Sequence, residues 1–332
     1  MVLGFETTSR WAEEQGAGLW LSEEWMDLFN RDRYEGRGAA TIQMIGPSET
    51  REAFWPGPIE AAFPEARFLN DAVSFSTLAD GVSQLEYIER AYGRGAIGKR
   101  LVVAASLRWL VGYAPGTRPL GPAIDKYSAW FRLDETQTPQ ALVPKTPLEA
   151  LVARVRLAGH QSARFRRGLS TIAAHAKSRY LGVPLEPLLR EKYLVHSRYH
   201  TREPHDQRQF QLRALAGEGL YDRTRTMNPA GRRADEIRGH FAKIREIAER
   251  NGSTLYVVTV PEASWLQVFF TPETAHGYGQ MLQELAPPGH FLDLRGRVPD
   301  SEFFDWLHVT HEGGLRASRE LAEFIKAIED SA

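Results

Sequence analysis

Five short apolar runs, separated by stretches with helical periodicity, restrict this chain to a small set of folds. The runs are Thr41–Ile45, Arg67–Leu69, Arg100–Ala105, Thr254–Val260 and Phe291–Leu294. Because they are largely continuous instead of alternating, they predict strands that are covered by helices on both faces. Strands that alternate with helices predict an α/β fold, here a three-layer α/β/α sandwich around a mostly parallel five-stranded sheet.

The helices between these strands are indicated by spacing and by terminal residues. Val82–Tyr92 and Glu236–Arg250 both repeat apolar residues at helical intervals, and each is followed by a glycine that can end a helix. Pro272 follows a capping threonine and is expected at the first helical position. The last helix is predicted to begin at Thr310.

Residues 112–228 interrupt the alternation of strands and helices. This stretch opens with the Pro/Gly-rich segment Ala114–Pro122, and Thr146 resembles a helix cap that leads into an Arg-rich helical pattern. We expect a helical insertion between the third and fourth strands, acting as a lid or a subdomain. The α/β domain would then consist of residues 1–111 and 229–332.

The composition excludes several classes of chemistry and leaves the cellular location open. The chain of 332 residues has no cysteine, so thiol catalysis, disulfides and cysteine-bound metal are excluded. No apolar run approaches the roughly 20 residues of a membrane helix. The sequence after Met1 lacks the pattern of a signal peptide. A cytoplasmic location is expected if Met1 is the native start, and an extracytoplasmic or membrane-anchored one if an anchor preceded it.

The net charge of −1 hides a strongly basic middle segment. Residues 151–250 carry 21 Lys and Arg against 10 Asp and Glu, whereas the rest of the chain carries 20 against 32. This segment is either a solvated helical face or a docking surface for an anionic polymer or partner. Its aromatic residues are too scattered for a base-stacking platform, so we do not expect nucleic acid as the partner.

Ser48 is the first candidate catalytic residue. It follows the apolar run Thr41–Ile45 after a glycine and a proline, and parallel sheets place their reactive groups at the carboxyl ends of strands. A serine hydroxyl becomes a nucleophile when a base takes its proton and an acid orients that base. A serine at this position can alternatively serve only as a helix cap.

Asp305 and His308 could supply the acid and the base from one short loop. The loop follows the last predicted strand and should return to the sheet edge where Ser48 lies. His308 would act as the general base, and Asp305 would fix its tautomer. The alternative is a capping aspartate beside a structural histidine. A metal site that adds His311 is a poor one, and His196, His200, His205 and Asp206 are loosely spaced, so we expect no metal.

These residues resemble the SGNH/GDSL hydrolase superfamily. They are most similar to its divergent branch, which includes sugar O-acetyltransferases of alginate and cellulose and D-alanyl transfer proteins. Ile45–Ser48 resembles the nucleophile block, with proline in place of aspartate, and Asn70–Ser76 resembles the second block. Asp305–Gly313 resembles the last block, and Val258–Pro261 resembles the strand-end proline segment of this branch.

The resemblance implies a Ser48–His308–Asp305 triad and an oxyanion hole. In the first two blocks, Gly46, Asn70 and the position of Phe75 would contribute to that hole or to the substrate site. The asparagine that the family places after the third strand is absent, and Ser106 or Arg108 would have to donate in its place.

The expected function is that of an esterase or O-acyltransferase which works through an acyl-serine intermediate and needs no cofactor. The branch favours an acetylated carbohydrate or a related small-molecule ester as substrate. Tryptophan side chains could stack on a sugar or lie in the core; they are Trp55, Trp109, Trp265 and Trp306. The alternative is a non-catalytic protein that retains the fold and binds an anionic partner through its basic insertion.

Overall fold

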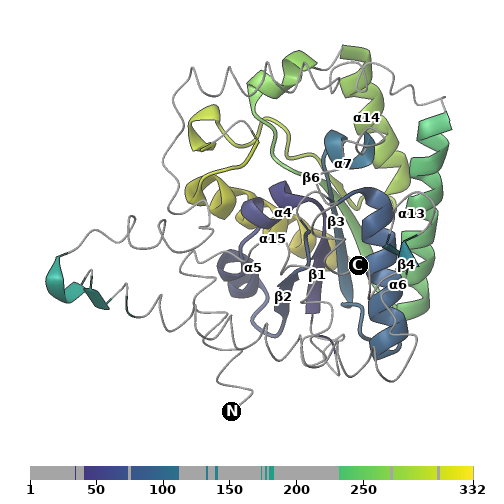
Figure 1. Ribbon diagram of the computed structural model, residues 1–332, viewed down its shortest axis with the longest axis horizontal. Helices are drawn as coiled ribbons and strands as arrows, with labels where there is room; N and C mark the ends of the chain where they lie inside the picture. The colour runs from purple at the N-terminus through teal and green to yellow at the C-terminus, as the bar shows by residue number, and fades with distance from the viewer. Residues whose placement is uncertain are drawn as a thin grey trace.

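A five-stranded, all-parallel sheet forms the centre of the molecule (Figure 1). The computed structural model describes residues 34, 41–73, 76–111, 132–133, 139–140, 173, 176–177, 179–182, 232–269, 272–304 and 307–331. Across the sheet the strands are β2 (Arg67–Asn70), β1 (Thr41–Ile45), β3 (Arg100–Ala105), β6 (Thr254–Thr259) and β7 (Phe291–Leu292). The predicted α/β class and parallel sheet are confirmed, and each predicted run overlaps one of these strands.

The helices follow the strands in the order that the sequence predicts. They are α4 (Ser48–Ala53), α5 (Pro56–Ala62), α6 (Leu78–Tyr92), α7 (Leu107–Val111), α13 (Arg232–Asn251), α14 (Pro272–Leu285) and α15 (His311–Glu329). Two 3₁₀ turns, η4 (Ser264–Phe269) and η5 (Asp300–Glu302), lie between them. Pro272 begins α14 and Thr310 caps α15 with its side chain, as predicted.

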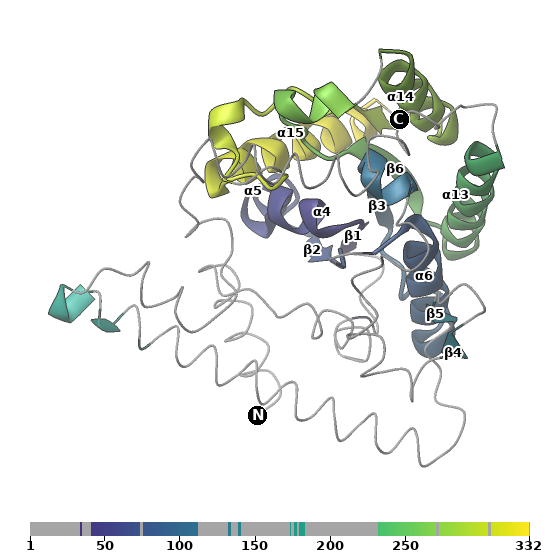
Figure 2. The same ribbon diagram turned by 45° about the horizontal axis from the view of Figure 1, so that its top comes forward.

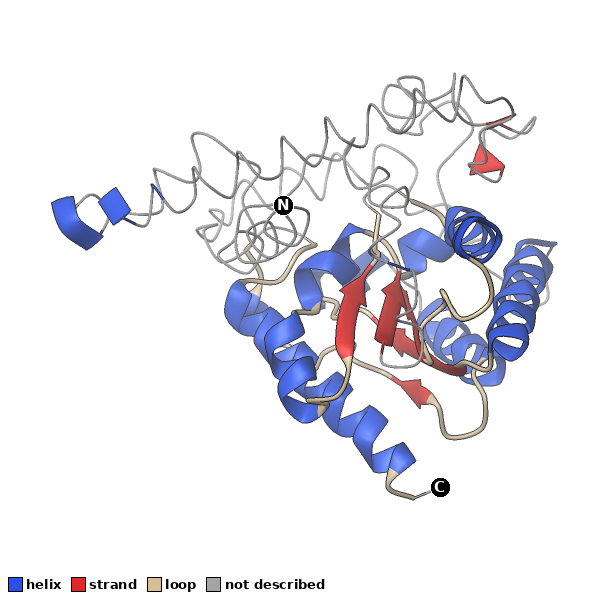
Figure 3. Ribbon diagram, turned by 90° about the horizontal axis from the view of Figure 1, so that it is seen from below, coloured by secondary structure: helices blue, strands red, loops and turns tan. Residues whose placement is uncertain are grey.

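Alternate residues of the central strands belong to two separate hydrophobic clusters. Ile42 and Met44 of β1 pack with residues of α5 and α15, whereas Ile45 packs with residues of α6, α13 and α14. Figure 2 shows the same arrangement, with α5 and α15 on one side of the strands and α6 and α13 on the other, and Figure 3 shows helices on both sides of the strands from below. Burial on both faces explains why the strand sequences are continuously apolar.

One polar residue lies in the middle of β1 without loss of hydrogen bonds. Gln43 is fully buried, and its amide nitrogen donates to Asp71 at 2.7 Å. Its amide oxygen accepts from the backbone N–H of Gly98 at 2.8 Å. Because a buried polar group is tolerated when its partners are present, Gln43 ties β1 to the segments that flank it on both sides.

The strand order creates a topological switch point at the carboxyl edge of the sheet. β1 lies between β2 and β3, so the chain leaves β1 towards one neighbour and later returns to the other. Ligands of open α/β sheets bind at such a switch point, outside the carboxyl ends of the strands. Ser48 follows β1 and Ser106 follows β3, so both predicted residues belong to this edge.

Most of the predicted insertion, 112–228, lies outside the described residues. Within it the structure describes the antiparallel pair β4 (Arg132–Leu133) and β5 (Pro139–Gln140), together with a few helical positions between 173 and 181. The predicted domain limits and the lid or subdomain role of this segment therefore stay predictions. Among the described helices, none combines the length and apolar character needed to cross a membrane.

Gly46 allows the chain to turn from β1 into α4 directly against β3. A Cβ atom at this position would clash with the hydroxyl of Thr50 and would lie 2.5 Å from the carbonyl oxygen of Ala104. The hydroxyl of Thr50 also donates to that carbonyl at 3.4 Å. Gly46 is therefore needed for the close packing that fixes the start of α4.

We expect Gly46→Ala to destabilise the protein by about 1–3 kcal/mol, the usual cost of forcing one extra carbon into a packed interior. The free energy of unfolding in urea measures this effect. Gly57→Ala is the matched control, because Gly57 is exposed in α5 and an added Cβ would meet no atom within 4 Å. Equal stability of the two variants would contradict this account of Gly46.

Candidate functional site

Ser48 is the first residue of α4, at the carboxyl end of β1. Pro47 holds the N-cap position, and no side chain caps this helix. The capping alternative for Ser48 is therefore wrong, because the residue lies inside the first turn and its hydroxyl bonds elsewhere. Ser48 is nearly buried, with 9% of its surface exposed.

His308 is held by the short loop that precedes α15. Phe303 and Val309 form an antiparallel bridge, and the backbone N–H of Phe304 donates to the carbonyl of His308 at 3.0 Å. The ring of Phe304 stacks on the imidazole with centroids 5.8 Å apart. These contacts fix both the backbone and the ring plane of His308.

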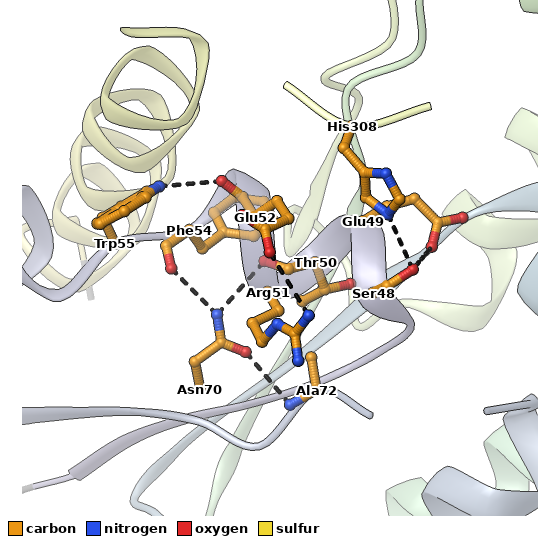
Figure 4. Close-up of polar contacts among 10 residues, drawn as sticks. All are labelled: Ser48, Glu49, Thr50, Arg51, Glu52, Phe54, Trp55, Asn70, Ala72 and His308. Atoms are coloured by element: carbon orange, nitrogen blue, oxygen red, sulfur yellow. Dashed lines mark hydrogen bonds and ion pairs between the residues drawn. The ribbon is translucent and has the colours of Figure 1, made fainter. Parts of the chain in front are cut away.

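Ser48 and His308 meet although 260 residues separate them in the sequence. The distance between Oγ of Ser48 and Nε2 of His308 is 3.0 Å, a hydrogen bond (Figure 4). When Nε2 carries a lone pair, it can accept the serine proton during attack on a carbonyl carbon. The structure thus brings together two of the three residues predicted for the triad. Asp305 lies outside the described residues, so its role stays a prediction.

No protein-family model matches this chain, and no curated protein matches it significantly. The assignment of chemistry therefore depends on the geometry of the site itself.

Glu49 is a second acceptor at the same hydroxyl. Its Oε2 lies 3.0 Å from Oγ of Ser48, and its Oε1 accepts from the hydroxyl of Ser106 at 3.2 Å. The residue is 2% exposed. The sequence interpretation did not include Glu49, although its place directly after the candidate nucleophile put it at the strand edge.

The residues predicted for the oxyanion hole have several different roles in the structure. Ser106 accepts from the backbone N–H of Trp109 at 3.1 Å and gives its single proton to Glu49. Donation by Ser106 to an oxyanion would therefore require its bond to Glu49 to break. Arg108 lies in α7, but its side chain is outside the described part, and so is Phe75.

Asn70 connects the end of β2 to the helix that carries Ser48. Its amide nitrogen donates to the carbonyl oxygens of Thr50 at 3.3 Å and Phe54 at 3.0 Å, and its oxygen accepts from the N–H of Ala72 (Figure 4). In this arrangement both amide protons face the backbone of α4 and its C-cap. Asn70 thus positions α4, and its predicted contact with substrate stays a prediction.

Charged side chains follow β6 and β7 on the same edge: the buried Glu262 and the partly exposed pair Asp293 and Arg295. Burial raises the pKa of Glu262 to about 7, against the opposing charge of Arg295 and with further upward contributions from Asp293 and Glu49. Burial alone would also raise the pKa of Asp293, but hydrogen bonds from Arg295 outweigh it and hold that pKa low. Arg295 donates through Nε to Asp293 at 2.9 Å.

A tyrosine next to these charged side chains also has a raised pKa. Burial, with a smaller contribution from Glu262, raises the pKa of Tyr278 well above its ordinary value. Its hydroxyl donates to the carbonyl of Ala105 at 3.0 Å, and the guanidinium of Arg295 lies 5.0 Å from its ring centre. Tyr278 is therefore a neutral donor that holds the end of β3.

The tryptophans that could have stacked on a sugar are mostly structural. Trp55 is buried, and its ring lies edge-on to His311 with centroids 4.5 Å apart. Trp109 is also buried and donates through Nε1 to Ser76 at 3.0 Å. Trp265 is partly buried against Phe303, and Trp306 is outside the described residues. The core alternative holds for Trp55 and Trp109.

In the part of the chain that the structure describes, no three His, Asp or Glu side chains gather in a way that could hold a metal ion. His311 is the first residue of α15 and contacts Trp55. The loosely spaced group from His196 to Asp206 lies outside the described residues.

Proposed function

We propose that this chain is an SGNH-type serine esterase or O-acyltransferase with an acyl-serine intermediate. The observation that carries the proposal is the 3.0 Å hydrogen bond between Ser48 and His308 at the switch point of a parallel sheet. Neither side chain caps a helix. A serine–imidazole pair at this place is the minimum that nucleophilic acyl transfer requires.

In this mechanism Ser48 Oγ attacks the ester carbonyl while His308 Nε2 receives the hydroxyl proton. His308 then returns the proton to the leaving alcohol, and the acyl group stays on Ser48 until an acceptor removes it. Asp305 would orient the imidazole. Backbone N–H groups at Ser48 and in the turn 70–76 would stabilise the oxyanion. Ser106 could add to them only if its bond to Glu49 broke, and Arg108 stays a predicted donor.

The resemblance to the SGNH branch also gives the finer parts of this proposal. It favours an acetylated carbohydrate or a related small ester as substrate, without a cofactor. The helices on both faces of the sheet agree with the three-layer SGNH-like arrangement, in which residues 112–228 would form a helical insertion. The basic segment 151–250 would contact an anionic partner.

A fluorophosphonate probe tests the proposed nucleophile. We expect one adduct on the purified protein, located at Ser48 by peptide mass spectrometry, and none on Ser48→Ala. The variant should keep a melting temperature within about 3 °C of the wild type, because it removes one nearly buried hydroxyl. An adduct elsewhere, or none on folded protein, would remove the nucleophile assignment.

A non-catalytic binding protein is the second candidate function. The hydrogen bond from Ser106 to Glu49 favours it, because it occupies the side-chain proton that was expected to reach an oxyanion. The same probe separates the two functions, since a binding protein without an activated serine would stay unlabelled.

A further inference from the structure

The tryptophan of α7, Trp109, donates to two serine hydroxyls with two different groups. Its backbone N–H donates to Oγ of Ser106 at 3.1 Å, and its indole Nε1 donates to Oγ of Ser76 at 3.0 Å. Trp109 is 1% exposed, and both serines are also buried. The two bonds are therefore shielded from water, in an environment where a hydrogen bond is electrostatically stronger than at the surface.

The contact with Ser76 continues to the backbone just before Ser48. Oγ of Ser76 donates to the carbonyl oxygen of Gly46 at 3.3 Å, and the backbone N–H of Val73 donates to the same oxygen at 2.9 Å. Val73 and Ser76 belong to the turn 70–76, whose backbone N–H groups would stabilise the oxyanion. The indole therefore helps to hold this turn against the segment that leads into the candidate nucleophile.

The contact with Ser106 leads to the other side of the candidate nucleophile. Oγ of Ser106 donates to Oε1 of Glu49 at 3.2 Å, and Glu49 directly follows Ser48 in α4. Trp109 is therefore connected by hydrogen bonds to the chain on both sides of the nucleophile. A substitution that removes only the indole N–H breaks the connection through Ser76. It leaves the other connection in place, because that one uses the backbone N–H.

The indole ring is also fixed by packing beside α6 and the end of β1. A Cβ atom on Gly81 of α6 would lie 2.9 Å from Cζ2 of Trp109 and 3.4 Å from Cδ1 of Ile45, the last residue of β1. The absence of a side chain at Gly81 thus leaves room for the ring, which packs directly against this turn of α6. Packing and hydrogen bonding therefore hold the same group.

We propose that Trp109 is a positioning residue for the acyl transfer, which holds the turn 70–76 at a fixed distance from Ser48. This inference rests on the proposed function. Donors stabilise an oxyanion only from hydrogen-bond distance, so a small shift of the turn relative to the nucleophile reduces the rate. Binding of the ground-state substrate depends less on this distance. The loss on removal of the indole N–H is therefore in kcat and not in KM.

Trp109→Phe tests this role with p-nitrophenyl acetate as the substrate. Phenylalanine keeps an aromatic ring in the site but has no group that can donate to Ser76. We expect kcat to fall about 5- to 50-fold, with KM within about 2-fold of the wild type. Phenylboronic acid, whose tetrahedral adduct with a serine resembles the reaction intermediate, should bind more weakly by about the factor that kcat/KM loses.

Trp55→Phe is the matched control. Trp55 is also buried, and its Nε1 donates to the carbonyl oxygen of Glu52 at 2.9 Å, so the same substitution removes one buried indole hydrogen bond. We expect its kcat to stay within about 2-fold of the wild type, although both variants lose stability to a similar extent. A kcat of Trp109→Phe that is no lower than that of Trp55→Phe would overturn the proposal.

A second variant, Ser76→Ala, removes the other member of the same connection. It should lower kcat as Trp109→Phe does, and the double variant should be no slower than the slower single variant, because both changes break one connection. Losses that multiply in the double variant would overturn the proposal. If Trp109→Phe does not fold, an unchanged kcat of Ser76→Ala would overturn it. Absence of fluorophosphonate labelling at Ser48 of the wild type would instead remove the proposed function itself.

Discussion

Replacement of His308 by alanine should reduce ester hydrolysis by about 10⁴- to 10⁶-fold in kcat, the range found when a serine hydrolase loses its base. The imidazole contacts Oγ of Ser48 at 3.0 Å and, in the proposed mechanism, accepts its proton during attack. The rate of p-nitrophenolate release measures the loss, with the rate of fluorophosphonate labelling as a second readout.

His276→Ala is the matched control for this variant. His276 is exposed on α14, so the same substitution there should leave both rates unchanged. The His308 variant also removes a ring that stacks on Phe304, and circular dichroism is needed to show that it folds. A folded His308→Ala protein that keeps more than a tenth of the wild-type rate would contradict the assignment of the base.

Glu262→Gln should stabilise the protein at pH 8 by about 3 kcal/mol and much less at pH 5. Its pKa is raised by burial from 4.5 to about 7 in the folded state, and each unit corresponds to about 1.4 kcal/mol. The folded state therefore binds this proton more tightly than the unfolded chain. The stability that the folded state has with a neutral Glu262 is therefore fully present below about pH 4.5, and it is lost as the pH rises through about 7.

Urea unfolding at pH 5 and pH 8 measures this difference. Glutamine keeps an oxygen that can accept from the backbone N–H of Leu107, as Glu262 does, so no buried donor is left unsatisfied. Glu249→Gln on the exposed face of α13 serves as the control and should change the stability little at either pH. A gain for Glu262→Gln that is the same at both values would show that burial of the charge is not its cause.

The sheet was predictable because its three central strands are almost entirely buried. Continuous apolar runs located all five, and β3 extends over the predicted residues Arg100–Ala105 without a difference. The ends of other elements were less certain. β7 stops at Leu292 because Leu294 bonds through its backbone to the side chain of Thr259 and not to a strand. α6 starts at Leu78, earlier than the apolar spacing indicated, because Thr77 and Asp80 form a capping box.

The site was predictable in part. Ser48 and His308 were found because each follows a strand and lies in a recognisable local pattern, and the parallel sheet brings such positions to one edge. Glu49 and Glu262 were missed because nothing in the sequence shows which neighbouring carboxyl groups turn inwards. The partner of Ser106 was missed for the same reason, since only the fold shows that Ser106 faces Glu49 across β1 and β3.

The dependence of His308 on the last helix has a consequence for the order in which this protein becomes active during synthesis. Ser48, α4 and β1 leave the ribosome early, but the loop of His308 is fixed by Thr310 and α15, which packs against α4 and α5. Ser318 of that helix also accepts from the backbone N–H of Trp55 at 2.8 Å. A nascent chain that lacks this helix therefore carries Ser48 and His308 without the packing that holds them together. In the proposed mechanism, such a chain would become active only after α15 has packed against α4 and α5.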